Sequence, residues 1–343
     1  MWYIGVDLHR KSLTLAAVHD SGQVRPPVRF DCQDTEQILA AFSDLSPFRA
    51  VIEATSTYRW LHDLIHGHGT VVLAHPQRLR AMTLRRSKTD RLDSQLLAQL
   101  LRLDQIPLAY IPEPRYQRLR ELTRYRGRLT QALAQVKVGL RLILARQNRL
   151  APYKVPFGPR GRYWFSRQDF GPVDNLIRDE LLERFTHFEK QITALNEQFE
   201  KLRPEYPEVE ALLVLPGIGL YSALMVVGEF GDVTRFRMAK QAAAYTGLTT
   251  RVFQSGDTCR HGHISRQGSA WLRWILLEAA MKFVRKDVPL ANFYERIRKR
   301  ASAKIARVAA ARKLAEICWK RLVRWHRELG RQKPTKEIER VAA

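Results

Sequence analysis

Short apolar runs separated by polar turns make up the beginning of the chain. Their alternation and length predict buried or half-buried strands, at residues 3–7, 13–18, 28–32, 50–54 and 71–74. Apolar residues at helical intervals predict amphipathic helices, at residues 35–42, 61–66 and 89–103. Strands that alternate with helices indicate an α/β domain, to which we assign residues 1–112.

Beyond Pro112 and Pro114 the apolar residues follow heptads instead. One row repeats every seven residues with a second row beside it, and together they comprise Leu122, Leu129, Val136, Ile143, Leu133 and Leu140. A second stretch alternates steps of four and three residues, through Leu181, Phe185, Phe188, Ile192, Leu195, Phe199 and Leu202. Such spacing is typical of coiled coils. It predicts two long helices that pair within the chain or between chains, in an oligomerisation or spacer connector at residues 113–206.

The last part of the chain has a mainly helical pattern. An uncharged run at residues 211–228 is long enough to raise a membrane span. Pro216, Gly217 and Gly219 break this run into two short helices joined by a tight turn, which favours a buried helical hairpin and no membrane partner. We predict a loop region at residues 247–268 and basic helices after it. The resulting mainly α domain spans residues 207–330, and a tail spans residues 331–343.

The charge of the chain points to nucleic acid. With 58 Lys and Arg against 34 Asp and Glu, the formal net charge is +24, which implies a polyanionic partner. No polybasic run lies beside a lipid-insertable helix, so nucleic acid is favoured over a membrane surface. Residues 1–17 lack the features of a signal peptide, and the odd number of cysteines suits a reducing compartment. We expect a cytoplasmic protein that acts at the bacterial nucleoid.

Several basic residues are candidates for contacts with nucleic acid. Residues 115–150 hold ten Lys and Arg and one acid, so their exposed face, including Arg124 and Arg128, is expected to bind phosphate. The alternative is a solvated coiled-coil face. Between the two heptad stretches, basic and aromatic residues mix in a way that suits base stacking or backbone contacts, and a packed loop is the alternative. These residues are Arg160, Arg162, Arg167, Tyr163, Trp164 and Phe165.

Two further motifs suggest phosphate contacts. The turn around Gly217 and Gly219 resembles a helix-hairpin-helix turn, in which glycines let backbone N–H groups approach a phosphate. A plain helix turn is the alternative. Cys259, His261 and His263 are spaced closely enough to suggest zinc, but no second ligand pair accompanies them. We therefore expect His261 and His263 to contact phosphate.

Four carboxylates carry the strongest chemical signal. Asp7 and Glu53 end two apolar strands, and Asp90 and Asp93 lie three residues apart at the start of a helix, on one helix face. Clustered carboxylates repel one another unless cations bind, and such oxygen ligands suit Mg²⁺. Two such ions can activate a nucleophile and stabilise a leaving oxygen in phosphoryl transfer. Taken singly, each acid can also be a solvated or helix-capping residue.

Three motifs surround these acids, at residues 3–7, 51–58 and 88–93, and two follow downstream, at residues 215–219 and 244–256. Together and in this order they resemble the DEDD insertion-sequence transposases of the IS110 family. The resemblance implies a RuvC-like, RNase H-like fold for the α/β domain and a metal-binding catalytic tetrad made of the four acids. It also implies a serine nucleophile, Ser255, which forms a covalent phosphoserine link with DNA. A hydroxyl needs a base or metal nearby, which an acidic cluster in a partner subunit would supply.

The same resemblance implies further partners. Members of the family are guided by a bridge RNA whose loops pair with donor and target DNA, which fits the absence of helix-turn-helix, zinc-finger and homeodomain signatures. We predict a transposase that works as a dimer or tetramer. One alternative is a hydrolytic RuvC-like junction resolvase or nuclease that does not use Ser255. The other is a non-enzymatic nucleic-acid-binding protein with structural carboxylates. The segment at residues 152–172 does not map onto the family pattern.

Overall fold

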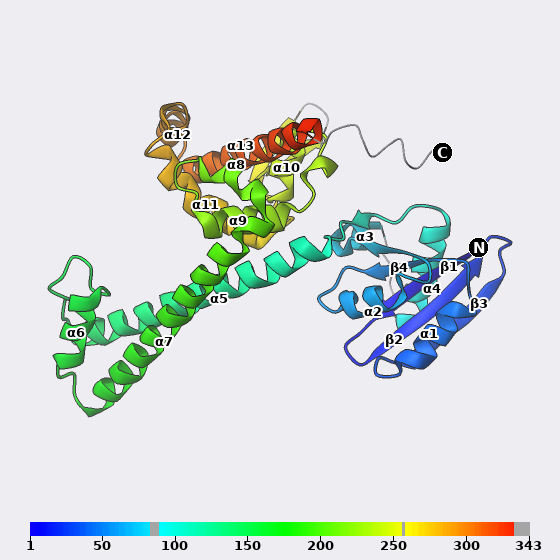
Figure 1. Cartoon of the computed structure of the whole chain (residues 1–343), viewed down its shortest axis with the longest axis horizontal. Coiled ribbons are helices and arrows are strands. Elements are labelled where there is room, and N and C mark those ends of the chain that lie inside the picture. Colours follow the sequence, from blue (N-terminus) through cyan, green and yellow to red (C-terminus); the bar gives the residue numbers. More distant parts are fainter. Residues whose placement is uncertain (83–88, 256–257, 333–343) are drawn as a thin grey trace. The chain divides into compact units, whose positions relative to one another are not determined.

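The computed structural model describes residues 1–82, 89–255 and 258–332, without the side chains of Ser255, His261 and residues 330–332. The chain divides into two compact units, Met1–Ile111 and Pro112–Ala343 (Figure 1). Most of the predicted tail, residues 333–343, lies outside the described residues, as does Lys88 of the third acidic motif. Within the described ranges, no helix has the length and apolar character that crossing a membrane requires.

A six-stranded mixed sheet forms the centre of the first unit, in the order β3-β2-β1-β4-β5-β6. The neighbours β1/β4 and β4/β5 are parallel, and the other three pairs are antiparallel. The strands are β1 (Trp2–Leu8), β2 (Ser12–His19), β3 (Val24–Asp31), β4 (Phe48–Glu53), β5 (Thr70–Ala74) and β6 (Leu108–Ala109). The helices are α1 (Thr35–Ser43), α2 (Tyr58–Ile65), α3 (Pro76–Met82) and α4 (Asp90–Arg102). The predicted α/β class of this part is confirmed, and β6 and α3 are additions that the apolar pattern does not predict.

Helices pack on both faces of this sheet. On one face, Val6 and Ile52 share a core with Leu61 of α2 and with side chains of α1. On the other face, Val51 packs with Leu97 of α4. Neighbouring residues of one strand point to opposite faces, so β1 and β4 contribute alternately to the two cores. This alternation decides where the acids at the strand ends point.

Gly5 lets α4 lie directly against β1. A Cβ atom on this glycine would lie 2.0 Å from the carbonyl oxygen of Ser94 and 2.4 Å from the amide nitrogen of Ala98. Any side chain would therefore collide with helix backbone, which cannot rotate away. The glycine of the first acidic motif thus has a packing reason: it allows the helix that begins at Asp90 to approach the strand that carries Asp7.

We expect Gly5→Ala to lower the free energy of unfolding of the first unit by about 1–3 kcal/mol or more, as overpacking of a filled core does. Chemical denaturation followed by circular dichroism measures the change. Gly67→Ala is the matched control, because a Cβ there would meet nothing within 4 Å. Equal stability of the two variants would contradict the packing role of Gly5.

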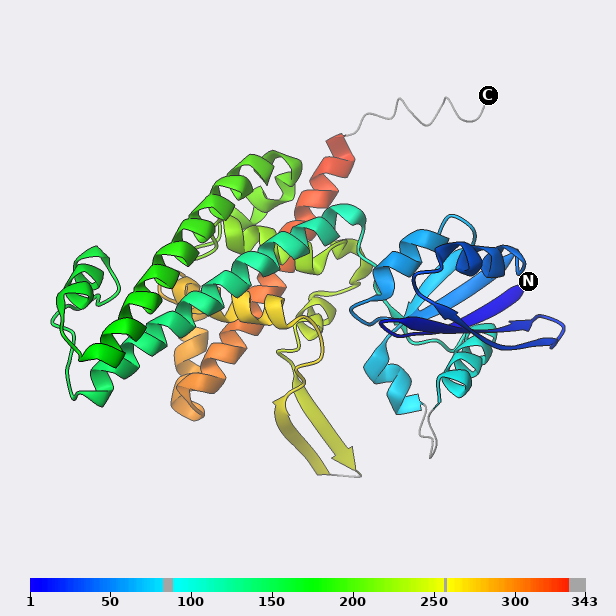
Figure 2. The same ribbon diagram turned by 90° about the horizontal axis from the view of Figure 1, so that it is seen from below.

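A long helical hairpin opens the second unit. In it α5 (Pro114–Arg146) and α7 (Pro172–Leu202) lie side by side, and α6 (Pro159–Arg167) packs on α7 (Figures 1 and 2). The two heptad stretches therefore pair within the chain. Leu122 does not belong to the buried row, since it is 37% exposed. The core between the helices contains Val136, Leu140, Ile143, Leu144, Phe165, Phe170 and Phe185.

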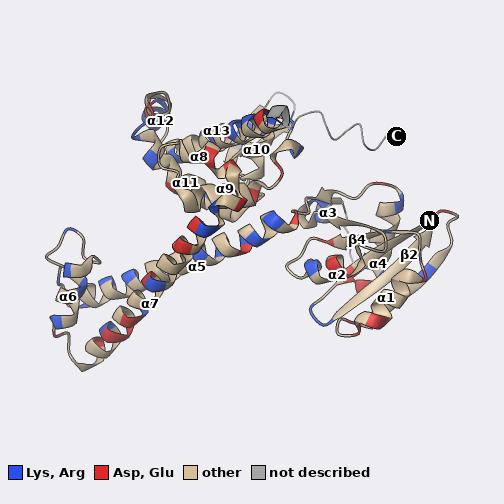
Figure 3. Ribbon diagram, in the orientation of Figure 1, with Lys and Arg blue, Asp and Glu red and all other residues tan. Residues whose placement is uncertain are grey.

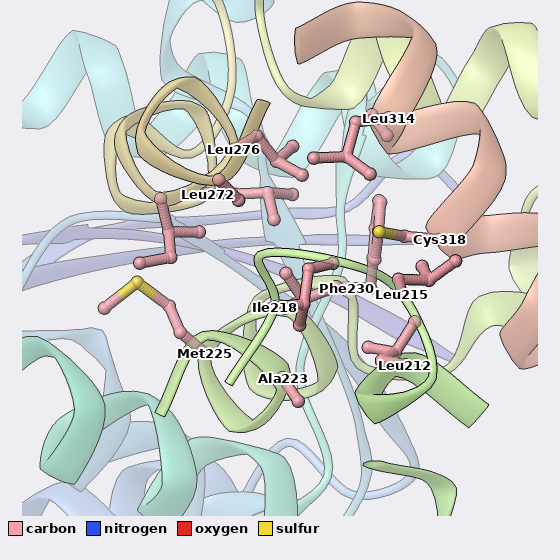
Figure 4. Close-up of a cluster of buried hydrophobic side chains, with 14 of the residues drawn as sticks. Leu212, Leu215, Ile218, Ala223, Met225, Phe230, Leu272, Leu276, Leu314 and Cys318 are labelled. Atoms are coloured by element: carbon pink, nitrogen blue, oxygen red, sulfur yellow. The ribbon is translucent and has the colours of Figure 1, made fainter. Parts of the chain in front are cut away.

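The remaining helices of the second unit share one apolar core, part of which is drawn in Figure 4. All residues of α9 from 223 to 230 are buried, where Met225 and Phe230 pack near Leu272 and Leu276. The uncharged run is thus a buried helical hairpin, as predicted. The helices are α8 (Glu210–Leu213), α9 (Leu220–Phe230), α10 (Ala239–Tyr245), α11 (Ala270–Val284), α12 (Val288–Arg300) and α13 (Ala303–Gln332). Short 3₁₀ turns lie at Arg203–Glu205, Pro207–Val209 and Val233–Arg235.

The loop predicted at residues 247–268 contains a two-stranded antiparallel sheet, so that prediction is wrong for its centre. The strands are β7 (Thr250–Ser255) and β8 (Thr258–Ile264), and their hairpin projects from the helices of its unit (Figure 2). Both faces of the hairpin carry exposed residues, among them Val252 and Phe253. Because neither face is buried, the strands show no alternation of apolar and polar positions, which is the signal that strand prediction uses.

Candidate active site

Asp7 and Glu53 lie at the same edge of the sheet, on neighbouring parallel strands. The last paired residues of β1 and β4 are Val6 and Ile52, and each acid is the next residue along its strand. Since side chains alternate between faces and Val51 belongs to the core beneath α4, both acids fall on the face that α4 covers. Strand register therefore brings together two carboxylates that are distant in the sequence.

The first turn of α4 adds Asp90 and Asp93. Thr89 caps this helix, because its Oγ1 accepts a hydrogen bond of 3.3 Å from the amide of Leu92. Acids in the first turn of a helix are stabilised by the helix dipole. The close packing of α4 at Gly5 then fixes the start of the helix beside β1.

His9 joins this group of acids. Its Nε2 lies 3.2 Å from Oδ2 of Asp7 and 3.3 Å from Oδ1 of Asp90. One donor atom from each of the three residues lies within 4.8 Å of the other two. From the sequence, His9 belongs only to a polar turn. The signal that marks it is its position two residues after Asp7, directly after the end of β1 at Leu8, where an imidazole is within reach of a carboxylate at the strand end.

The surroundings of Asp7 disfavour its ionised form. Burial raises the pKa of the Asp7 carboxyl, His9 lowers it, and the charges of Asp90 and Asp93 raise it again. A divalent cation bound between these carboxylates would relieve the repulsion, so the donor set fits a metal ion. His9 contacts both Asp7 and Asp90, Asp93 acts on Asp7 through its charge, and Glu53 is placed by strand register.

Ser255 is the last residue of β7 and pairs with Thr258 across the hairpin. Its side chain lies outside the described residues, so the structure places only its backbone. Phe253 lies two residues before Ser255 on β7 and is 60% exposed. Arg260, the cross-strand partner of Phe253, is exposed too. The hairpin therefore presents an aromatic and a basic residue next to Ser255.

The zinc alternative on this hairpin gains no support. Cys259 and His263 are exposed, and the side chain of His261 lies outside the described part of the chain. Among the residues searched, no group that could hold a metal includes Cys259. His263 stays a predicted phosphate contact, with its side chain on the open surface of β8.

Arg124 is half-buried and belongs to an ion pair whose acidic partner is fully buried. Its Nε and Nη2 donate hydrogen bonds of 2.6 and 2.9 Å to the carboxylate of Glu229, whose side chain is 0% exposed. Ser269 Oγ donates a third bond of 2.8 Å to the same carboxylate. Burial alone would lower the pKa of Arg124, but the hydrogen bonds and the charge of Glu229 raise it. This geometry indicates that Arg124 stabilises the packing of its unit, so its prediction as a phosphate contact is not supported. Arg128 is exposed and stays a candidate for a phosphate contact on α5, a helix along which basic residues are frequent (Figure 3).

The arginines of α6 also divide into two kinds. Arg162 forms an ion pair with Glu189 of α7, and its guanidinium lies 4.6 Å from the ring centre of Phe185. Arg160 and Arg167 are exposed. The segment is a packed helix and not an open aromatic loop, so only its exposed arginines stay candidates for contacts with nucleic acid.

Of the two glycines in the turn before α9, one is required for packing and the other borders open space. Gly217 has φ of 82°, and a Cβ there would lie 2.6 Å from Cβ of Lys282, so the turn and its packing on α11 both require glycine. Gly219 precedes α9 as its N-cap residue, and a Cβ there would meet nothing within 4 Å. Open space beside the first amides of α9 keeps Gly219 as the better candidate for a phosphate contact.

Two family models match the chain. A DEDD-type transposase model related to IS110 matches residues 4–148, which contain the four acids and His9. A second model, described as the transposase IS116/IS110/IS902 family, matches residues 209–295, which contain the β7–β8 hairpin. The chain belongs to the IS110 family of transposases. It is therefore a DNA transposase, an enzyme whose substrates are DNA and whose DEDD domain indicates a divalent metal.

Relatives of this transposase cover most of its length. The transposase for insertion sequence element IS1328 of Yersinia enterocolitica is 24% identical over 332 residues, which cover 92% of this chain and 95% of the relative. A protein of Sinorhizobium fredii named as transposase y4qE is 25% identical over 328 residues, covering 93% and 78%. The pilin gene-inverting protein of Moraxella bovis is 25% identical over 300 residues, covering 81% and 82%.

Proposed function

We propose that this transposase cuts and rejoins donor and target DNA by metal-assisted phosphoryl transfer at the acidic cluster of its first unit. The observation that carries the proposal is the convergence of Asp7, His9 and Asp90 at one sheet edge, with Asp93 and Glu53 beside them. Carboxylate oxygens favour Mg²⁺, so we assign that ion to Asp7, Glu53, Asp90 and Asp93. When bound, it would stabilise the charge that develops on the phosphate and the leaving oxygen.

We further propose that the first unit has the RuvC-like, RNase H-like fold that the family resemblance implies. The mixed sheet with acids at the end of its central parallel strands, and a helix over that face, supports this assignment. We keep as proposals a connector at residues 113–206 and a transposase domain at residues 207–330. Relatives named for gene inversion support the joining of DNA ends as well as their cleavage.

In this proposal Ser255 is the nucleophile. Its Oγ forms a bond to the scissile phosphorus, the bond from phosphorus to the sugar oxygen breaks, and that oxygen leaves as a hydroxyl after it takes up a proton. A protein–DNA phosphodiester results, so the energy of the broken link is kept for rejoining. Because a serine hydroxyl is a weak nucleophile at neutral pH, its proton must pass to a base. Carboxylates of the acidic cluster in a partner copy would accept it.

The geometry of the β7–β8 hairpin supports a role in binding DNA. An isolated two-stranded hairpin is marginally stable in water, and this one exposes Phe253 and its cross-strand partner Arg260 near the backbone of Ser255. An aromatic ring can stack on a base or sugar, and a guanidinium can bind the phosphate. Contact with DNA would thus both complete the hairpin and position the phosphate beside Ser255.

A covalent adduct tests the role of Ser255. The full-length protein is incubated with Mg²⁺, the RNA transcribed from the flanks of its gene, and end-labelled donor and target DNA. We expect a protein–DNA band on a denaturing gel that disappears in Ser255→Ala. Cys259→Ser, at an exposed residue of the neighbouring strand β8, is the matched control and should keep the band.

Two other outcomes would decide for the alternatives. Cleavage without any adduct, retained in Ser255→Ala, would identify a hydrolytic nuclease that uses water at the acidic cluster. Binding of DNA without cleavage in any variant would leave a non-enzymatic role and overturn the proposal. The net charge of +24 does not separate these cases, because all of them require nucleic acid.

We also propose that a bridge RNA guides the transposase and that it assembles as a dimer or tetramer. The basic residues along α5, α12 and α13 (Figure 3) provide charge for an RNA as well as for two DNA duplexes. Omitting the RNA from the reaction above should abolish cleavage at the proper site. Unchanged cleavage without RNA would overturn the proposed guidance by RNA and leave the other proposals standing.

A further inference from the structure

A second group of metal-ligating side chains lies on α2, apart from the acidic cluster. His62 and His66 are four residues apart at the end of this helix, and Asp63 lies between them. One donor atom from each of these three residues lies within 4.8 Å of the other two. Residues four apart face the same way on a helix, and two histidines at this spacing are a recurrent metal-binding arrangement.

The two imidazole rings are already aligned. Their planes are within 3° of parallel, and the ring centres lie 5.3 Å apart. The ring of Tyr58 stands at 83° to that of His62, with ring centres 6.4 Å apart, and restricts how that ring turns. The rings start close together, and a single ion that accepts a lone pair from each Nε2 requires the two parallel ring planes to turn toward one another.

Hydrogen bonds fix which nitrogen of each ring faces a metal. His66 Nδ1 lies 3.0 Å from the carbonyl oxygen of Asp63 and 3.2 Å from that of His62. Carbonyl oxygens only accept hydrogen bonds, so Nδ1 must carry the proton, and Nε2 keeps its lone pair. His62 Nδ1 lies 3.1 Å from Oδ1 of Asp63, a carboxylate that likewise accepts the Nδ1 proton. This carboxylate–histidine arrangement is the one that orients metal-binding imidazoles in many metal sites.

We infer that His62 and His66 form a binding site for a transition-metal ion of the Zn²⁺, Ni²⁺ or Cu²⁺ type, through the Nε2 atoms, with Asp63 as the orienting carboxylate. Water completes the coordination shell. Imidazole nitrogen suits these ions, whereas Mg²⁺ prefers oxygen, so the site is chemically distinct from the catalytic cluster. It does not depend on the proposed function.

A metal ion bound by His62 and His66 would cross-link the last turn of α2 and stabilise it. The helix follows directly on β4, which carries Glu53, and its Leu61 and Ile65 belong to the main core of the sheet. An ion that binds the folded helix and not the unfolded chain stabilises the fold by an amount that grows with the logarithm of its concentration divided by its Kd. We therefore expect Zn²⁺ to raise the unfolding temperature of the first unit.

The test uses the full chain with Asp7→Asn and Asp90→Asn, which removes the acidic cluster as a competing site. Calorimetric titration with Zn²⁺ should show one bound ion, and a large excess of Mg²⁺ should not displace it. We expect His66→Ala to weaken binding at least tenfold. His66 is exposed and caps the helix, so its removal should leave the fold intact. His68→Ala, at a nearby exposed histidine, is the control and should bind as the parent does.

Cu²⁺ as a spectroscopic probe counts the ligands directly. Electron paramagnetic resonance should show two imidazole nitrogens in the parent and one in His62→Ala or His66→Ala. Equal Zn²⁺ affinity in the parent and in His66→Ala would overturn the site, as would a Cu²⁺ spectrum that neither substitution changes. Because these readouts measure binding and not recombination, they remain decisive whether or not Ser255 proves to be the nucleophile.

Discussion

Asp7→Asn should abolish metal-dependent cleavage and joining of DNA, with a loss of at least roughly 10²–10³-fold in rate, as when one group that stabilises transition-state charge is removed. Asp7 lies at the centre of the acidic group, in contact with His9 and within the field of Asp90 and Asp93. Asparagine has the same shape and no charge, so it cannot hold the cation in the same way. Time courses of adduct formation under excess protein measure the effect.

This loss should not come from unfolding. The pKa of Asp7 is raised in the folded state, mainly by burial, so the ionised carboxylate destabilises the fold at neutral pH when no cation is bound. Asp7→Asn removes that cost, and the variant should be at least as stable as the parent without metal. Mg²⁺ should then raise the unfolding temperature of the parent but not of Asp7→Asn. Asp44→Asn, at an exposed acid at the end of α1, is the matched control for both measurements.

A mixing experiment extends the same variant to the proposed sharing of sites between copies. Asp7→Asn keeps its serine, and Ser255→Ala keeps its acids. If the acids of one copy serve the serine of another, an equimolar mixture of the two inactive proteins should regain part of the adduct. No recovery, with both proteins shown to assemble together, would mean that each copy uses its own residues.

The acids could be predicted from the sequence because local patterns mark them. Asp7 and Glu53 each end an apolar run, and parallel strands bring such ends to one edge of the sheet. Asp90 follows a capping threonine at a helix start. The strand that carries Asp7 and the helix that carries Asp90 come together because they pack closely at Gly5. The sequence does not show which helix crosses β1 at this glycine. A glycine in a strand carries no such information by itself.

Residues whose role depends on a distant partner were harder to predict. Arg124 lies in a basic stretch, and the sequence alone suggests a phosphate contact. Its partner, Glu229, directly follows the uncharged run and lies more than a hundred residues away. Similarly, the strands around Phe253 have no buried face, so hydrophobic periodicity does not reveal them. Composition and local spacing predict elements and strand ends, but they do not predict which charged residues pair in the core.

Arg124→Ala should lower the free energy of unfolding of the second unit by up to about 3–5 kcal/mol, which is the usual cost of breaking a fully buried pair from one side. The substitution leaves the Glu229 carboxylate buried with Ser269 Oγ as its hydrogen-bond donor. The Glu229 side chain is 0% exposed while Arg124 is in place, but Arg124 itself is 35% exposed, so water that enters beside the carboxylate recovers part of this cost. Urea denaturation measures the change. Arg128→Ala, at an exposed arginine of the same helix, should change it by less than about 0.5 kcal/mol.

A double substitution separates the ion pair from simple packing. Replacing Arg124 with methionine and Glu229 with leucine removes both charges and keeps most of the volume, and apolar replacements of buried pairs are often close to neutral. The double variant should therefore be more stable than Arg124→Ala, even though it carries more changes. If Arg124→Ala instead unfolds at the same urea concentration as Arg128→Ala, the pair contributes nothing measurable to packing. In that case we would again interpret Arg124 as a phosphate contact on α5. Its substitution should then weaken DNA binding, and the size of this effect should depend on salt concentration.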